Sequence, residues 1–516
     1  MNFDGMNRRH FLACSGGSLL GASSHSLYGD EAKGGAQSFE SAALKRVALI
    51  DARWVDHSYF LTRQLARPQR VSANPVIAPA GAASTILPAD EGGFVMWYST
   101  VRWIKLKGVR THQSWIHYAT SKDGIVFDKP DLGIYEGNTL IKGDHPGADG
   151  KPITGVRGCS GFCVLDARHQ KVPHARARYT ALYRSWVPGR HGGMSLAHSE
   201  DGLHWTEYSE NPVWVGESDT FNNFFYDERI GKYVAYIRPR IHAGPKSANR
   251  SVARIVSDDM IHWAEHRIVL DTDDRDAPAV GTIDEAKLPD GTGYPRGRDK
   301  QFYGLTASPY GDLYLGFASV YDVEPGTMAI ELVHSYDGIE WHREATRRPL
   351  ISRGGKDAWD SAVVYYPGVG SPLEVGNGWL IYYHGLNFDH HQRNHSRKDL
   401  GEYRAMGVVK MKRDRLIGYE ARKTPGELLT RPFKWEGEKL FLNANAEGGR
   451  ARVAVCHESG YSPKGFHLNE AVPIEQDGVR LPVSFQGSAS LATLRGRLIR
   501  LRIHLENATV FGWEYS

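Results

Sequence analysis

The stretch His334-Ser335-Tyr336-Asp337-Gly338-Ile339-Glu340-Trp341 decides the fold, because close copies of it occur three more times in the chain. The shared pattern is Ser-x-Asp-Gly-x-x-Trp, with Phe in place of Trp in the first copy and Met in place of Gly in the third. The starting serines are 78, 58 and 78 residues apart, at Ser121, Ser199, Ser257 and Ser335. Self-similarity with a period of this order is typical of repeat architectures.

Each copy has the chemistry of a hairpin turn. The Asp side chain can accept hydrogen bonds from nearby backbone amides, and the Gly supplies a positive φ. Strand-like runs, such as residues 115–119 and 329–333, precede the turns. Four antiparallel strands per repeat make a propeller blade. A fifth copy without the turn spans residues 361–412, and residues 84–87 are the expected inner strand of the first blade. We therefore predict an all-β chain with a five-bladed β-propeller.

Two further segments flank the repeats. Residues 425–516 lack the pattern and carry short alternating runs, which predict a small antiparallel β-sandwich after a propeller over residues 45–424. Residues 1–35 are expected to be an export signal and linker. Arg8-Arg9 before Phe11-Leu12 resembles the bacterial twin-arginine signal, which predicts a periplasmic or extracellular protein. The apolar stretch that follows is shorter than the ~20 residues of a membrane span.

Composition narrows the expected partners. The chain has 63 basic and 59 acidic side chains and no basic run interleaved with aromatics, which argues against nucleic acid. Its 13 Trp and 25 Tyr favour strands and surfaces that stack on sugars. Cys159 and Cys163 are four residues apart on one expected strand, roughly 13 Å, too far for a disulfide. We expect a carbohydrate partner, no stable membrane insertion, and a monomer or small homo-oligomer.

The five-blade layout and the Ser-Asp-Gly turns resemble the superfamily of five-bladed propeller glycoside hydrolases, which includes families 32 and 43 and uncharacterised bacterial relatives. Residues 218–223, 298–303 and 359–361 look like blade-opening segments of such relatives, and residues 432–437 with 440–443 look like their appended sandwich. The resemblance covers roughly residues 45–516 and implies glycosidase activity. The Trp-Met-Asn-Asp-Pro and Arg-Asp-Pro motifs of family 32 are absent, which argues against fructan hydrolysis.

Propeller geometry indicates which side chains can meet. Inner strands start on one face, the mouth, and second strands end there, whereas the Ser-Asp-Gly turns lie on the opposite face. The four turn aspartates are therefore expected to be structural. Asp219, Asp299 and Asp360 open blades three, four and five, and glycoside hydrolysis needs two carboxylates. These three and Glu331, which interrupts an apolar third strand, are the catalytic candidates. Turn capping, a structural cation, or an outward-facing strand position are the alternatives.

The ends of second strands supply expected substrate-binding residues at the same mouth. They are Arg184, Trp186, Arg238, Asp322 and His384. Arginines hold carboxylates or sulfates through paired hydrogen bonds, so an acidic or sulfated glycan is a candidate substrate, with salt bridges to neighbouring aspartates as the alternative. His390, His391 and His395 share one loop, where solvation is more usual than metal binding. No cofactor is expected, and a structural calcium in the channel is left open.

Three functions compete. The leading hypothesis is a secreted glycosidase with two of the four carboxylates as its acid and its base or nucleophile. A sialidase-like hydrolase would need a tyrosine nucleophile and an arginine cluster, for which Tyr303 and Arg238 are candidates. A propeller that binds glycans without cleaving them is the third, because the scaffold alone does not specify chemistry.

Overall fold

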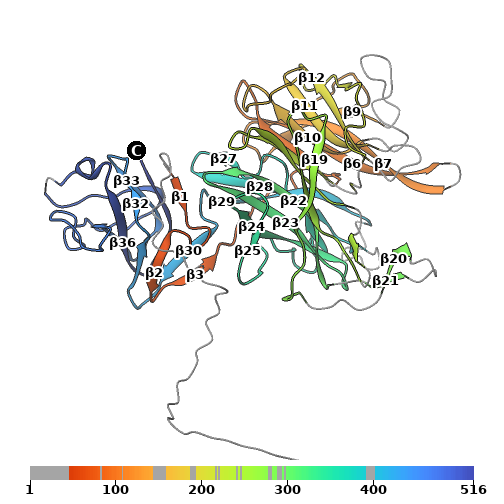
Figure 1. Cartoon of the computed structure of the whole chain (residues 1–516). Coiled ribbons are helices and arrows are strands. Elements are labelled where there is room, and N and C mark those ends of the chain that lie inside the picture. The colour runs from red at the N-terminus through yellow and green to blue at the C-terminus, as the bar shows by residue number, and fades with distance from the viewer. Residues whose placement is uncertain are drawn as a thin grey trace, which may run out of the picture.

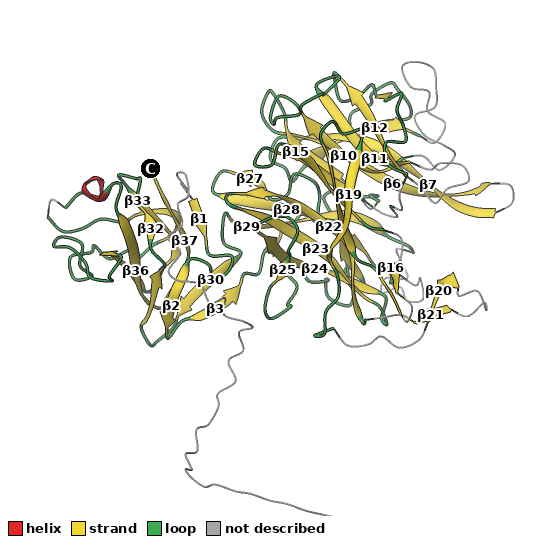
Figure 2. Ribbon diagram, viewed as in Figure 1, coloured by secondary structure: helices red, strands yellow, loops and turns green. Residues whose placement is uncertain are grey.

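A computed structural model of the chain describes residues 46–516, apart from residues 82–83, 107–108, 143–158, 186–192, 216–217, 219–220, 240–241, 245–246, 277–281, 288–292, 296–297, 391–400 and 488. The described part is all-β, and the helix that it contains is a single 3-10 turn at Leu491–Leu494 (Figure 2). In that part no helix is long and apolar enough to span a membrane. The predicted fold class is confirmed: a propeller lies beside a smaller β-sandwich (Figure 1).

The first three blades are separate antiparallel sheets, each in sequence order. Blade one consists of β5 (Ser84–Pro88), β6 (Phe94–Leu106), β7 (Val109–Ser121) and β8 (Phe127–Asp128), with β9 (Thr139–Ile141) beside β7. Blade two consists of β10 (Ser160–Asp166), β11 (Tyr179–Ser185), β12 (Gly193–Ser199) and β13 (Thr206–Glu207). Blade three consists of β14 (Asn223–Asp227), β15 (Lys232–Ile237), β18 (Val252–Ser257) and β19 (Trp263–Leu270). Two small hairpins, β16–β17 (His242–Gly244, Ser247–Asn249) and β20–β21 (Thr282–Lys287, Gly293–Pro295), stand apart from these sheets.

Blades four and five complete the ring. Blade four consists of β22 (Lys300–Tyr310), β23 (Leu313–Asp322), β24 (Thr327–Ser335) and β25 (His342–Arg343). Blade five consists of β26 (Val363–Tyr365), β28 (Gly378–Leu386) and β29 (Arg404–Lys412), with β27 (Leu373–Val375) beside β28. Its outer strand is β4 (Gln69–Arg70), which pairs with β29. The N-terminal segment therefore supplies the strand that the last repeat lacks.

Backbone contacts close the ring between blades five and one. The amide of Val369 donates to the carbonyl of Ser84 (2.9 Å), and the amide of Ile86 donates to the carbonyl of Val369 (3.0 Å). Because Ser84 and Ile86 belong to the inner strand of blade one, the first and last blades meet near the propeller axis. The predicted count of five blades is confirmed.

The Ser-Asp-Gly turns form as predicted and also join neighbouring blades. In the second turn, Oδ1 of Asp201 accepts hydrogen bonds from the amides of Leu203 and His204 (both 2.8 Å). Gly202 has φ 75°, and its carbonyl accepts a hydrogen bond from the indole of Trp97 in blade one (2.8 Å). Tyr382 donates in the same way to Gly124 (2.7 Å), and Tyr236 to Gly338 (2.9 Å). Three turns are thus each clasped to the preceding blade.

The third turn holds Met260 at the glycine position. Met260 keeps the positive φ (68°), and its carbonyl accepts a hydrogen bond from the indole of Trp263 in the same turn (2.6 Å). Its side chain is fully buried in the apolar cluster that blades two to five share. Apolar packing therefore takes the place of the aromatic clasp in blade three.

The sandwich has two sheets, and the N-terminal segment contributes to both. One contains β3 (Thr62–Leu65), β30 (Ile417–Ala421), β37 (Ala508–Tyr515), β33 (Leu440–Asn445) and β35 (Asp477–Pro482), with β1 (Arg46–Ala48) beside β37. The other contains β2 (Val55–Tyr59), β31 (Gly426–Thr430), β36 (Leu498–Glu506) and β32 (Phe433–Lys434), with β34 (Arg450–His457) beside β36. Strand pairing thus places residues 46–65 and 417–421 in the sandwich sheets, whereas the predicted division put them in the propeller. These short strands pair with sandwich strands that are distant in the sequence. Their local sequence therefore does not indicate the sheet to which they belong.

Candidate functional site

Arginines, tyrosines and a histidine from three blades meet at the propeller mouth. The guanidinium of Arg238, after β15, lies 4.4 Å from the ring centre of Tyr303 on β22. The guanidinium of Arg250, before β18, lies 4.9 Å from the ring centre of Tyr321 on β23. The Tyr303 hydroxyl is 3.0 Å from Nε2 of His390, which follows β28. We call these five residues the mouth cluster. It supplies positive charge and aromatic surface, which suits binding of a sugar that carries an anionic group.

Asp299 lies beside this cluster. Its carbonyl accepts a hydrogen bond from the amide of Val323 (2.9 Å). The backbone of Asp299 is therefore held to the end of β23, the second strand of blade four. Oδ1 of Asp299 is buried and has no hydrogen-bond partner among the described residues. A buried carboxylate oxygen without a donor is unfavourable unless a ligand or water meets it. Of the three predicted catalytic carboxylates that the structure describes, Asp299 is the one with an oxygen that no described donor meets.

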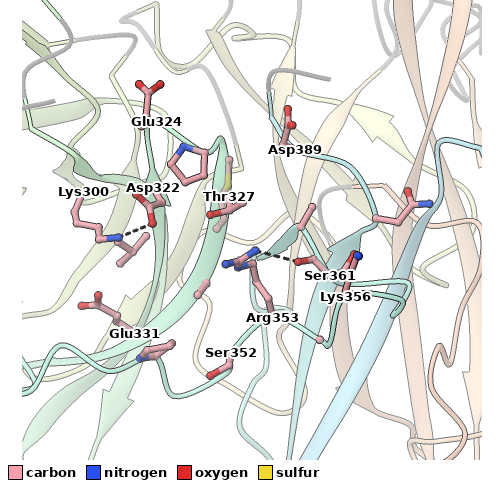
Figure 3. Close-up of a pocket in the computed structure, with 18 of the residues that line it drawn as sticks. Lys300, Asp322, Glu324, Thr327, Glu331, Ser352, Arg353, Lys356, Ser361 and Asp389 are labelled. Carbon is pink, nitrogen blue, oxygen red and sulfur yellow. Dashed lines mark hydrogen bonds and ion pairs between the residues drawn. The ribbon is translucent and has the colours of Figure 1, made fainter. Parts of the chain in front are cut away.

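A cavity of about 1050 Å³ adjoins the mouth cluster (Figure 3). Its described lining mixes both charges, with four cations and four carboxylates: Lys300, Arg347, Arg353, Lys356, Asp322, Glu324, Glu331 and Asp389. Lys300 follows Asp299 in the chain, and Asp389 precedes His390. The cavity and the mouth cluster therefore share two chain segments, although neither Asp299 nor any residue of the mouth cluster lines the cavity.

Asp360 faces away from a substrate and into blade five. Its Oδ2 accepts hydrogen bonds from Nε and a terminal nitrogen of Arg70 (3.0 and 2.8 Å) and from the Tyr383 hydroxyl (2.8 Å). Only 1% of Asp360 is exposed. Burial and then the charge of Asp360 raise the pKa of Tyr383 well above its usual value, so the phenol stays a donor. The carboxylate therefore holds β4 against blade five. The equivalent positions of the three aspartates in their blades did not predict this role.

Glu331 is also held in an ion pair. Two nitrogens of Arg343 donate to its carboxylate (3.0 and 3.2 Å), and Arg343 also contacts Asp276 (3.0 Å) at the edge of blade three. Burial raises the pKa of Glu331, and the charge of Arg343 opposes that rise. This network ties blade four to the segment that follows blade three. Glu331 lines the cavity, but its oxygens are occupied by Arg343.

The predicted binding residues have different environments. Asp322 lies in the cavity wall and pairs with Lys300 (2.6 Å). Arg184 donates from Nε to the carbonyl of Ser218 (3.0 Å), which joins blades two and three. His384 is fully buried, with Nε2 3.3 Å from Oγ of Ser84, and burial lowers its pKa to about 3. His384 therefore joins blades five and one as a neutral side chain and does not reach a substrate.

Some predictions lie outside the described residues: Asp219, Trp186, His391 and His395. Among the side chains that the structure describes, no three His, Cys, Asp or Glu residues converge as metal ligands. Cys159 and Cys163 are buried and unbridged, as expected.

Sequence reasoning missed Arg250 and Tyr321. Arg250 lies two residues before a third strand, and Tyr321 lies at the end of a second strand, so both positions belong to the mouth by topology. A survey of strand ends in every blade, rather than of aspartates and strand-ending arginines alone, would have found them.

Comparisons with known proteins concern the fold. An N-acetylgalactosamine deacetylase from F. plautii, in complex with blood group B trisaccharide, is 14% identical with a TM-score of 0.40; the match covers 69% of this chain and 96% of that chain. A thermostable family-43 glycoside hydrolase is 12% identical with a TM-score of 0.42, over 66% of this chain and 92% of that one. A structure from the GH130 family of mannoside phosphorylases is 14% identical with a TM-score of 0.40, over 67% and 94%.

Each of these matches extends over about two thirds of this chain and more than nine tenths of the other. No family model and no curated protein matches this chain. Identities of 12 to 15% speak to the fold and not to the reaction, so the chemistry is taken from the site itself.

Proposed function

We propose that this protein is an exported glycosidase whose reaction takes place at the propeller mouth, with Asp299 as one catalytic carboxylate. The observation that carries the proposal is the buried, unpartnered Oδ1 of Asp299 beside the mouth cluster. The carboxylates of Asp360 and Glu331 form ion pairs with Arg70 and Arg343. Among the catalytic candidates that the structure describes, Asp299 is therefore the one whose carboxylate is not held in such a pair. The twin-arginine signal at Arg8-Arg9 accounts for export.

The second carboxylate in this proposal is Asp219, which opens blade three as Asp299 opens blade four. In glycoside hydrolysis one carboxylic acid protonates the glycosidic oxygen as the bond to the anomeric carbon breaks. The other carboxylate either takes a proton from the attacking water or attacks the carbon itself.

The proposed substrate is an acidic or sulfated glycan. Arg238 and Arg250 are buried, with 3% and 5% of each residue exposed, and both lie against tyrosine rings. Guanidinium groups in such surroundings bind carboxylate or sulfate more strongly than they do in water, because the local dielectric is low.

The test is release of reducing ends by the purified protein from matched charged and neutral polysaccharides. We expect release from a polyuronate or a sulfated galactan and none from neutral counterparts, with at least a hundredfold loss in Asp299→Asn. Binding without release from any glycan would instead identify a carbohydrate-binding propeller. Release that persists in Asp299→Asn would remove Asp299 from the chemistry.

A sialidase-like reaction is the second candidate, and one observation favours it. The guanidinium of Arg238 lies over the ring of Tyr303, whose hydroxyl bonds His390, a base that could take the phenol proton from a tyrosine nucleophile. Under this alternative Tyr303→Phe abolishes hydrolysis of a sialoside, and Asp299→Asn does not distinguish the two reactions. Under the leading proposal Tyr303→Phe changes KM more than kcat.

A further inference from the structure

The sandwich carries an arginine-rich face on the sheet that contains β36. Buried and partly exposed residues alternate along β36, with Ile499, Leu501 and Ile503 in the core. The intervening residues, Arg500, Arg502 and His504, therefore lie on the outer face. On the neighbouring strand β34, the core residues Ala451 and Val453 place Arg450 and Arg452 on that same face. We call these four arginines and His504 the arginine face.

The register joins this face to an exposed aromatic edge. Tyr59 on β2 pairs with Glu427, Glu427 pairs with His504, and His504 pairs with Arg452. These four residues form a row across four adjacent strands, roughly 14 Å wide at the spacing of a β-sheet. Tyr59 is 57% exposed.

Further aromatic rings lie close by. A terminal nitrogen of Arg502 donates to the carbonyl of Gly460 (3.5 Å), and the next residue, Tyr461, is 79% exposed. Phe60, next to Tyr59, is 78% exposed and has φ 52°. A positive φ is unfavourable for a bulky residue and marks a constrained position. Exposed aromatic rings on two sides of the arginine face provide surfaces on which sugar rings stack.

The arginines have hydrogen-bonding capacity left over. Nε of Arg452, Arg500 and Arg502 is buried and has no hydrogen-bond partner. Arg500 pairs with Asp56, and Arg502 lies 3.7 Å from Glu427, whereas Arg452 has no ion pair within 4.0 Å among the described residues. The side chain of Arg502 is nevertheless 38% exposed, so its guanidinium can donate to an anionic ligand on the outer face.

We propose that the arginine face, with Tyr59 and Tyr461, binds a polysaccharide chain that carries sulfate or carboxylate groups. Glu427, Asp56 and Glu506 are interspersed among the arginines, which disfavours the dense phosphates of a nucleic acid and suits anions spaced along a glycan. The sheet of the arginine face lies on the side of the sandwich away from the propeller (Figure 1). This site is therefore separate from the mouth and does not depend on the proposed reaction.

The experiment is native affinity electrophoresis of the full chain in gels that contain dextran sulfate, polygalacturonate, unmodified dextran or duplex DNA. We expect retardation by at least one of the two charged glycans and none by dextran. The double change Arg452→Gln and Arg502→Gln should weaken binding at least tenfold. Arg480→Gln should leave it unchanged, because Arg480 lies on β35 in the other sheet and pairs with Glu514.

Tyr461→Ala tests the aromatic part without altering charge, and should weaken binding severalfold even if the arginine variant fails to fold. Asp299→Asn should bind like the wild type, so loss of hydrolysis and loss of this binding are separable. Equal retardation of the wild type and a folded arginine variant would overturn the proposal. Retardation by duplex DNA as strong as by the charged glycans, lost in the same variant, would reassign the face to nucleic acid.

Discussion

The two faces of the propeller use aspartate in opposite ways. On the turn face, four aspartates at 123, 201, 259 and 337 make the same bonds, each accepting backbone amides two and three residues ahead. At the mouth, Asp299 has an unpartnered oxygen and Asp360 is locked to Arg70. Uniform surroundings accompany a structural role that every blade needs, whereas the divergent surroundings at the mouth indicate that equivalent aspartates have different roles.

The largest effect on stability is expected at Asp360. Asp360→Ala leaves the guanidinium of Arg70 and the hydroxyl of Tyr383 without their acceptor and frees β4 from blade five. We expect the free energy of unfolding to fall by about 3 kcal/mol, at the low end for a buried ion pair because Arg70 is partly exposed. Denaturant titration measures the change, and Asp299→Ala is the matched control with less than about 1 kcal/mol. Equal losses in both variants would contradict the difference between the two aspartates.

The unusual turn of blade three gives the next effect. Met260→Gly relieves a positive φ but removes a fully buried side chain from the shared apolar cluster. The lost packing outweighs the relief, and we expect a net destabilisation of about 2 kcal/mol. Met260→Leu, which nearly conserves volume, should cost less. Stabilisation by glycine would show that the turn backbone, and not packing, dominates this position.

The aromatic clasps are individually weaker. Tyr236→Phe removes the hydrogen bond to the carbonyl of Gly338 and keeps the ring, so a loss of about 1 kcal/mol is expected. Tyr382→Phe removes the equivalent bond to Gly124 and should cost a similar amount. Thermal unfolding of the two variants side by side checks this equivalence. Clearly unequal losses would mean that the clasps are not interchangeable between blades.

Acid pH should act gradually on the turn face. Burial opposes ionisation of Asp201, but hydrogen bonds from the side chain and amide of His204 and from the amide of Leu203 outweigh it and lower the pKa to about 2. The ionised form therefore contributes stability above about pH 4, and that contribution is lost as pH falls from about 4 to 2. Asp201→Asn should show a shallower decline over this window when unfolding is followed against pH. An identical decline would assign the acid sensitivity elsewhere.

Sequence reasoning reached the parts of the fold that repeat. The strand-like runs predicted at residues 115–119 and 329–333 lie within the observed strands Val109–Ser121 and Thr327–Ser335, because local sequence and turn chemistry specify them. Gln69–Arg70 was missed as an outer strand, since two residues that pair across more than 300 positions have no local pattern. The ion pair between Asp360 and Arg70 was missed for the same reason, because the two residues are 290 positions apart in the sequence. Equivalent sequence positions predicted three equivalent aspartates, but side-chain direction depends on neighbours such as Arg70 that the repeat does not encode.

We propose a division of roles in which the mouth performs the chemistry and the turn face holds the blades together. Its most direct test is to measure kcat and the free energy of unfolding for Asp299→Asn and Asp201→Asn, on a glycan that the wild type hydrolyses. We expect Asp299→Asn to lose at least a hundredfold in kcat with nearly unchanged stability. Asp201→Asn should lose stability and keep its kcat below the unfolding transition. Full activity in Asp299→Asn, or loss of activity in a folded Asp201→Asn, would contradict this division between the faces.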